Sequence, residues 1–179
     1  MSAAFLHSAI GHHEDAVCVL DQVDLHALSA SDISHWLNAR AYALALTGHV
    51  TEALEHLRDA EDLLVGIEDT EPVTSESIQV LASCIIGTRG IALLHGDSLD
   101  EAEIQLEKAL ALGAAQLAQA RSDQVPEQQR LAAERLWWLA AIAEKRRVAS
   151  HRLDCLRRAS KFADTPYGIE ARKALELIS

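Results

Sequence analysis

Aromatic residues and proline are scarce in this sequence. Of 179 residues, 4% are aromatic and 3 are proline, whereas 49% are hydrophobic, mainly alanine and leucine. Strands favour aromatic and β-branched residues, and proline interrupts helices. Alanine and leucine are strong helix formers. The composition therefore excludes a disordered chain and predicts an all-α fold with a substantial apolar core.

Cysteine and long apolar runs are also scarce. The 3 cysteines, Cys18, Cys84 and Cys155, are far apart and no C-x-x-C occurs, which argues against a disulfide framework or a zinc knuckle. The N-terminus lacks the basic and apolar regions of a signal peptide. The longest apolar runs, such as WWLAAIA, fall short of a membrane span. We therefore expect a cytoplasmic protein that does not insert into a membrane.

Catalytic and metal-binding motifs are missing. The sequence has no P-loop, no G-x-G-x-x-G and no G-x-S-x-G, and its HHED segment lacks the second histidine of H-E-x-x-H. Carboxylate pairs such as Glu61-Asp62 fall on predicted solvated faces, without the burial that a catalytic pair needs. We predict a protein that is not an enzyme and that holds no cofactor or metal. A metal-binding or pH-sensing role for some of the 9 histidines is the open alternative.

Charge is distributed unevenly along the chain. Residues 1–132 carry 6 Lys/Arg and 21 Asp/Glu, whereas residues 133–179 carry 10 and 6, so a net charge of −15 precedes one of +4. The acidic body argues against a nucleic-acid partner. The basic end has two interpretations, a solvated face with cations at a helix C-terminus, or a docking patch for an acidic partner. Its residues are Lys145, Arg146 and Arg147 at the end of one predicted helix, and Arg152, Arg157 and Arg158 on the next.

The segment ARAYALALTGHVTEALEHLRDA, from Ala39 to Ala60, has the pattern of two helices joined by a short turn. Gly48 interrupts the first apolar stripe, as a helix-ending glycine does. We expect Thr51 to cap the helix that follows. Because the connection is so short, the two helices are predicted to lie antiparallel.

This pattern recurs along the chain. Small residues and leucines reappear at a spacing of 49, then more weakly at a spacing of 50, and a fragment at the start matches at a spacing of 37. Such periodicity is typical of stacked helical hairpins. The best match is between Ala41, Leu44, Ala53, Leu57 and Ala60 and the later set Gly90, Leu93, Ala102, Leu106 and Ala109; Leu139, Ala140, Ala143, Leu156 and Ala159 form the weaker copy.

These residues resemble the tetratricopeptide repeat (TPR), although the copies are about 50 residues apart rather than 34 and the closing proline is absent. The resemblance implies a right-handed α-α superhelix, a TPR-like solenoid of three to four antiparallel helical hairpins with a C-terminal capping helix. The predicted single domain, 1–179, contains a partial hairpin at 3–25, repeats at about 34–66, 74–116 and 126–163, and a capping helix at 166–178. Pro72, Pro126 and Thr165-Pro166 mark helix starts. VGIEDTEPVTSES and AQARSDQVPEQQ are expected to be loops or frayed ends.

The resemblance also implies a concave groove lined by the first helix of each hairpin. Its wall would be largely apolar, which suits an amphipathic helix or an extended peptide. Of the polar residues with which some family members grip a chaperone's carboxylate, only Asn38 is matched, so that activity is not expected. The predicted partner-binding residues are Asn38, Tyr42, Ile91, Leu94, Trp137 and Trp138.

The leading hypothesis is a non-enzymatic adaptor that binds a protein or peptide in this groove. Two alternatives stay open. One is a self-associating structural protein, with the groove wall and Trp138 forming a homodimer seam. The other is a ligand-sensing regulatory domain of the kind found in bacterial transcription regulators.

Overall fold

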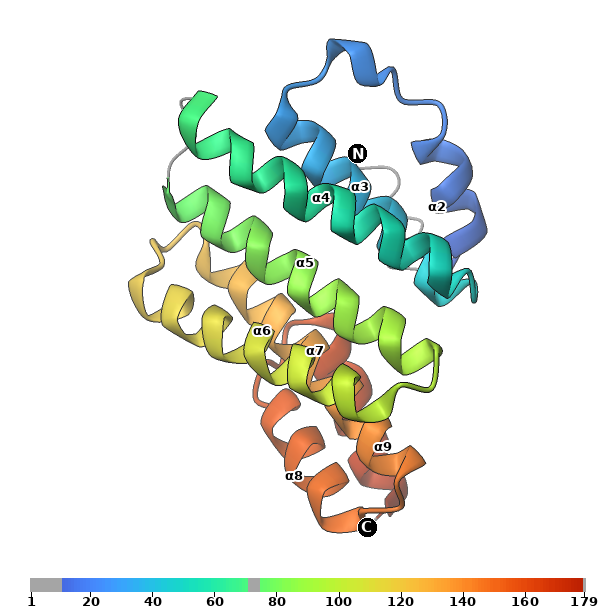
Figure 1. The fold of residues 1–179 in the computed structure, drawn as a ribbon. Helices are drawn as coiled ribbons and strands as arrows, with labels where there is room; N and C mark the ends of the chain where they lie inside the picture. The colour runs from blue at the N-terminus through green and yellow to red at the C-terminus, as the bar shows by residue number, and fades with distance from the viewer. Residues whose placement is uncertain (1–10, 71–74, 179) are drawn as a thin grey trace. The chain divides into compact units, whose positions relative to one another are not determined.

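A computed structural model describes residues 11–70 and 75–178 of the chain, and within these residues it contains helices and no strand. The all-α prediction is therefore confirmed for the described part of the chain. The helices are arranged in the order shown in Figure 1: α2 (His13–Leu20), the short 3₁₀ helix η1 (Leu25–Ala27), α3 (Ala30–Leu46), α4 (Val50–Thr70), α5 (Ser75–His95), α6 (Leu99–Gln119), α7 (Val125–Lys145), α8 (Ala149–Ala159) and α9 (Pro166–Ile178).

The chain divides into two compact units, Met1–Ser98 and Leu99–Ser179. The first contains α2 to α5 and the second contains α6 to α9. The boundary lies between α5 and α6, inside the predicted repeat at 74–116. Each unit is described separately below.

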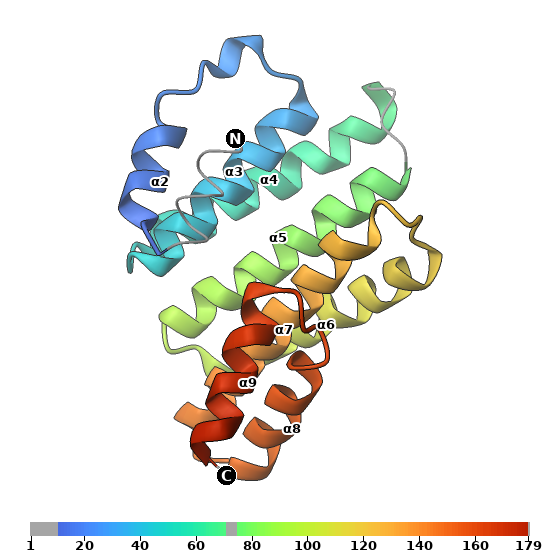
Figure 2. The same ribbon diagram turned by 180° about the vertical axis from the view of Figure 1, so that it is seen from behind.

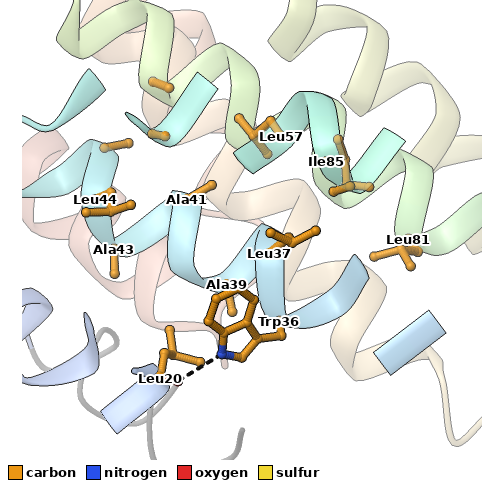
Figure 3. Close-up of a cluster of buried hydrophobic side chains, with 14 of the residues drawn as sticks. Leu20, Trp36, Leu37, Ala39, Ala41, Ala43, Leu44, Leu57, Leu81 and Ile85 are labelled. Atoms are coloured by element: carbon orange, nitrogen blue, oxygen red, sulfur yellow. Dashed lines mark hydrogen bonds between the residues drawn. The ribbon is translucent and has the colours of Figure 1, made fainter. Parts of the chain in front are cut away.

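In the first unit, α3 packs against α2, α4 and α5, and α4 packs against α5. Figure 3 shows the resulting core, in which Leu37 of α3, Leu57 of α4 and Ile85 of α5 approach one another. Leu57 and Ile85 are fully buried. Ala41 and Ala53 are also fully buried, so the small residues on the expected helix faces lie in the core. Small side chains permit helices to approach closely.

In the second unit, α7 is the central helix and packs against α6, α8 and α9, while α8 also packs against α9. Figure 2 shows α8 and α9 beside α7. Residues at matched places of the repeat are again buried: Leu106 and Leu156 are at most 2% exposed, and Ala102, Ala109 and Ala159 are inaccessible. The predicted register therefore puts small and leucine side chains into this core as well.

The same closed turn ends three helices. After α3, α5 and α7, the chain passes through a residue in the left-handed conformation, Gly48 (φ 86°), Asp97 (φ 59°) or Arg147 (φ 59°). In each turn this residue's N–H donates to the carbonyl three residues earlier, and the next N–H donates to the carbonyl five residues earlier, at 2.8–3.2 Å. This pair of bonds is the Schellman motif. The three turns follow the predicted spacings of 49 and 50, and Gly11 (φ 84°) before α2 has the same backbone conformation.

Several predicted helix boundaries are confirmed. Gly48 follows the end of α3, and the Thr165 hydroxyl accepts a hydrogen bond from the Gly168 N–H at 3.0 Å as the cap of α9. Thr51 does not cap α4, because that helix begins one residue earlier at Val50. The two segments expected to be loops or frayed ends are partly helical. In the first, α4 continues to Thr70 and α5 begins at Ser75; in the second, α6 continues to Gln119 and α7 begins at Val125. Residues 3–10 of the predicted partial hairpin and the helix start at Pro72 lie outside the described residues.

Among the residues that the structure describes, one helix is long and apolar enough to cross a membrane, judged by length and composition alone. It is the stretch 76–95 of α5, and half of its most apolar window is buried inside the structure. A search for uninterrupted apolar runs misses this helix because Arg89 and small polar residues divide it. The core helix of a folded domain meets the same criterion, so the finding is weak evidence for a membrane span.

Candidate functional site

The predicted groove residues of the first unit lie on α3 and α5, and they differ in exposure. Tyr42 is half-buried, and Asn38 is 8% exposed, with no hydrogen-bond partner for its Oδ1 among the described residues. Ile91 and Leu94 of α5 are only 2% and 3% exposed. In this conformation Ile91 and Leu94 have almost no surface to offer a partner, whereas Tyr42 does.

The two predicted groove residues of the second unit lie side by side in the sequence on α7. Trp137 and Trp138 are both half-buried. The ring of Trp137 lies 6.5 Å from that of Tyr167 on α9, and the Tyr167 hydroxyl donates to Glu134 at 3.1 Å. Trp137 therefore takes part in the packing of α9 against α7 while keeping part of its surface accessible. The role of Trp137 and Trp138 in partner binding stays a prediction.

The basic end divides into paired and unpaired cations. Arg146 forms ion pairs with Asp100 and Glu103 of α6, and Arg152 pairs with Glu144 at 3.2 Å. Arg158 pairs with Asp154 at 3.6 Å. Arg147 and Arg157 are exposed and have no ion-pair partner among the described residues. The patch therefore contains a structural ion-pair network at Arg146 and uncompensated positive charge at Arg147 and Arg157.

An apolar hollow of about 280 Å³ lies beside Arg147 at the turn between α7 and α8. Arg147 and Arg152 are its cations, and Glu144 is the carboxylate among the described residues that line it. Its apolar lining comes from α7, α8 and the end of α9: Ala143, Val148, Ala149, Leu153 and Ile178. Sequence reasoning found the cations but missed the hollow, because the lining comes from three helices whose packing the local pattern does not specify.

A buried arginine in the second unit was also missed. Arg135 of α7 is 3% exposed, and its Nη1 donates to the carbonyl of Ala109 on α6 at 2.8 Å. A buried guanidinium is costly unless hydrogen-bonded. Position 113 is glycine, and an added Cβ there would lie 2.3 Å from the same Nη1. The glycine is therefore the sequence signal that leaves room for the guanidinium.

In the first unit, polar and aromatic groups join α2, α3 and α4. The indole N–H of Trp36 donates to the Leu20 carbonyl at 2.9 Å (Figure 3). Arg40 forms ion pairs with Asp21 at 3.0 Å and with Glu52 at 2.7 Å, and its guanidinium contacts His56. Burial, together with the positive charge of Arg40, lowers the pKa of His56. This group of side chains has a structural role, since every partner belongs to the packing of the three helices.

Comparison of the chain with protein-family models, curated proteins and solved structures finds no match. The function must therefore be argued from the site chemistry.

Among the described residues, Cys155 and His151 of α8, together with Glu103 of α6, form the group that most resembles a catalytic triad. The sulfur of Cys155 lies 3.8 Å from Nε2 of His151, and the same nitrogen lies 3.6 Å from a carboxylate oxygen of Glu103. A nucleophile–base–carboxylate relay uses both ring nitrogens, which this geometry does not. Burial also raises the pKa of Cys155 to about 11, so the unreactive thiol is the form present near neutral pH. Among residues 11–70 and 75–178, no three His, Cys, Asp or Glu side chains are grouped as a metal site would require.

Proposed function

We propose that this chain is a non-enzymatic helical-repeat protein of the TPR-like kind, and that it binds a protein or peptide partner. The observation that carries the proposal is the recurrence of one Schellman turn at Gly48, Asp97 and Arg147, at the spacings of the sequence repeat. Equivalent hairpins that bury equivalent small residues are how solenoid proteins are built. The right-handed superhelix is part of this proposal.

The proposed partner-contacting residues are those of the first helices that keep accessible surface. Tyr42 on α3 and Trp137 on α7 are half-buried, and both are aromatic. Tyrosine and tryptophan are enriched among the residues that dominate binding energy at protein interfaces. The thiol of Cys155 is buried, and His151 contacts both Cys155 and Glu103 through the same ring nitrogen, Nε2. Both features support the hypothesis that the protein is not an enzyme.

The test is affinity capture from the cells that produce the protein, with wild-type chain and a Tyr42→Ala/Trp137→Ala variant as baits. We expect a partner to be retained by the wild type and lost with the double variant. Arg121→Gln, which removes a side chain that is 73% exposed, is the matched control and should retain it. Melting curves must show that the double variant folds, because Trp137 packs near Tyr167. Equal retention by both baits, or no retained protein, would contradict the proposal.

Self-association is a second candidate, because α6 exposes apolar side chains. Ile104 is 59% exposed and Leu112 is 38% exposed, and Lys108 lies one turn from each. Two such residues on one helix face can form part of a symmetric seam. Light scattering at micromolar concentration distinguishes the candidates, and a monomer that persists would eliminate the dimer.

A further inference from the structure

The hollow beside the α7–α8 turn has features that the proposed groove does not use. Its volume of about 280 Å³ lies just below the range for ligand pockets, about 300–1,000 Å³. Such a volume suits one or two aliphatic side chains rather than a whole cofactor. Val148 and Ile178 at its edge are 44% and 43% exposed, so apolar surface is open to solvent here.

The charge beside the hollow is positive and uncompensated. Arg152 is neutralised by Glu144 at 3.2 Å, whereas Arg147 has no ion-pair partner among the described residues. Arg157 is likewise unpaired and follows Leu153 by one helical turn on α8. A ligand that places an aliphatic group in the hollow would therefore meet at least one free guanidinium.

Arg147 is also an unfavourable residue for its backbone conformation. The equivalent positions carry glycine at 48, which adopts a positive φ freely, and aspartate at 97, which tolerates it. An arginine at φ 59° is less favourable than a glycine at the same place. Strained residues of this kind concentrate at functional sites. Here the strained residue itself lines the apolar hollow.

We propose that this hollow docks an acidic amphipathic segment of a partner protein, with one or two aliphatic side chains inside and a carboxylate on Arg147. Charge complementarity commits the site to an acidic ligand, and the apolar lining commits it to aliphatic side chains. The described residues that line the hollow include neither Tyr42 nor Trp137. The proposal therefore goes beyond the adaptor function and is tested separately from it.

The experiment is a titration of the full chain with short, end-blocked synthetic peptides. The first peptide is made of glutamate and alanine with two leucines one helical turn apart. In the second peptide glutamine replaces glutamate, and in the third alanine replaces leucine. We expect the first peptide alone to bind in the micromolar range by fluorescence anisotropy, and to lose several-fold in affinity as salt rises from about 50 to 300 mM.

The decisive variant is Arg147→Gly, because glycine suits the turn. It should raise the melting temperature by roughly 2–4 °C while weakening binding of the acidic peptide by at least about tenfold, so lost binding cannot be ascribed to unfolding. Leu153→Gln should weaken binding through the hollow. Two control variants should bind the acidic peptide as the wild type does. Asp97→Gly changes the equivalent turn of the first unit, and Arg121→Gln removes an exposed cation of the second unit, to which Arg147 belongs.

Three outcomes would overturn the proposal. The first is that Arg147→Gly binds the acidic peptide unchanged. The second is that the glutamine or alanine peptide binds as well as the first, which would leave either charge or apolar contact without a role. The third is that the chain alone sediments as a dimer that Arg147→Gly dissociates, which would make a second copy the occupant. The Tyr42→Ala variant changes the proposed groove on α3 and leaves α7 and α9 intact, so it should titrate as the wild type does, which separates this site from the proposed groove.

Discussion

The guanidinium of Arg135 occupies the space that a side chain at Gly113 would need. An ideal Cβ at position 113 would lie 2.3 Å from Nη1 of Arg135, and that nitrogen donates to the Ala109 carbonyl one turn earlier on α6. Glycine in a helix interior is less favourable than alanine by about 1 kcal/mol. Gly113 lowers the helix propensity of α6, but the space left by its missing side chain lets Arg135 of α7 donate its hydrogen bond to α6.

Replacing this glycine should therefore destabilise the second unit. Gly113→Ala would displace the Arg135 guanidinium, and we expect the free energy of unfolding to fall by about 1–2 kcal/mol in spite of the better helix propensity. Gly66→Ala on α4 is the matched control, since nothing lies within 4 Å of its added Cβ, and it should be stabilising by up to about 1 kcal/mol. Urea unfolding of both variants measures the two effects, and a stabilised Gly113→Ala would refute the role given to Arg135.

Gly168 should be still less tolerant of substitution. Its added Cβ would lie 2.1 Å from the carbonyl oxygen of Phe162, which is backbone and cannot turn aside. Gly168→Ala must distort either this carbonyl or the Thr165 cap, and we expect a loss of about 2–3 kcal/mol. Hydrogen exchange should show the loss as faster exchange in α9. Ile169→Ala, at a neighbouring side chain that is 41% exposed, should leave that exchange nearly unchanged.

The hydrogen bond between Trp36 and the Leu20 carbonyl should contribute measurably to the first unit. Trp36→Phe keeps an aromatic ring but removes the indole N–H and leaves the carbonyl without this donor. Together with the smaller ring, this should cost about 1–3 kcal/mol in chemical denaturation. Because Leu20 ends α2, the amides of α2 should exchange faster in the variant, and unchanged exchange there would contradict the assigned contact.

The first unit should lose stability in mild acid. Burial lowers the pKa of His56 and of His35 below the ordinary value near 6.5, and Arg40 adds to the effect at His56. The groups facing His56 are Arg40, Glu52, Asp59 and Trp36, and the two carboxylates only partly oppose the lowering.

The sign follows from where the proton binds more tightly. The unfolded chain binds it more tightly at these histidines, so the free energy of unfolding is highest above about pH 6.5 and falls as the pH drops below that value. Melting temperatures from pH 8 to pH 5 measure this, because carboxylates contribute mainly at lower pH. His56→Gln should flatten the profile and His26→Gln, at an exposed position, should not; a profile that is flat for the wild type would contradict the prediction.

The helix ends show what a single sequence can predict. Gly48 and Thr165 were recognisable because a left-handed turn and an N-cap each favour particular residue types. The turn at Arg147 was predictable only from its register, since arginine carries no such preference. The end of α4 was placed too early because Val65–Thr70 is rich in residues that neither favour nor forbid a helix, and packing decides such cases.

The site was less predictable than the fold. Ile91 and Leu94 were assigned to the groove wall from the resemblance to the TPR and their matched places in the repeat, but the exposure of a side chain depends on what packs against it. Arg135 reads in the sequence as an ordinary surface cation, and only the glycine opposite it explains its burial. The hollow beside Arg147 depends on three helices meeting, a long-range property that a local pattern does not contain.

Glycine, aspartate and arginine form the same turn in this chain, so the surrounding helices hold this backbone shape with three residue types of different preference. The residue type at the left-handed position can therefore vary without loss of the turn, although a residue such as Arg147 makes its backbone conformation less favourable than glycine does. Each hairpin of such a protein offers one variable site at its tip, where new recognition chemistry can arise by single substitutions without redesign of the scaffold.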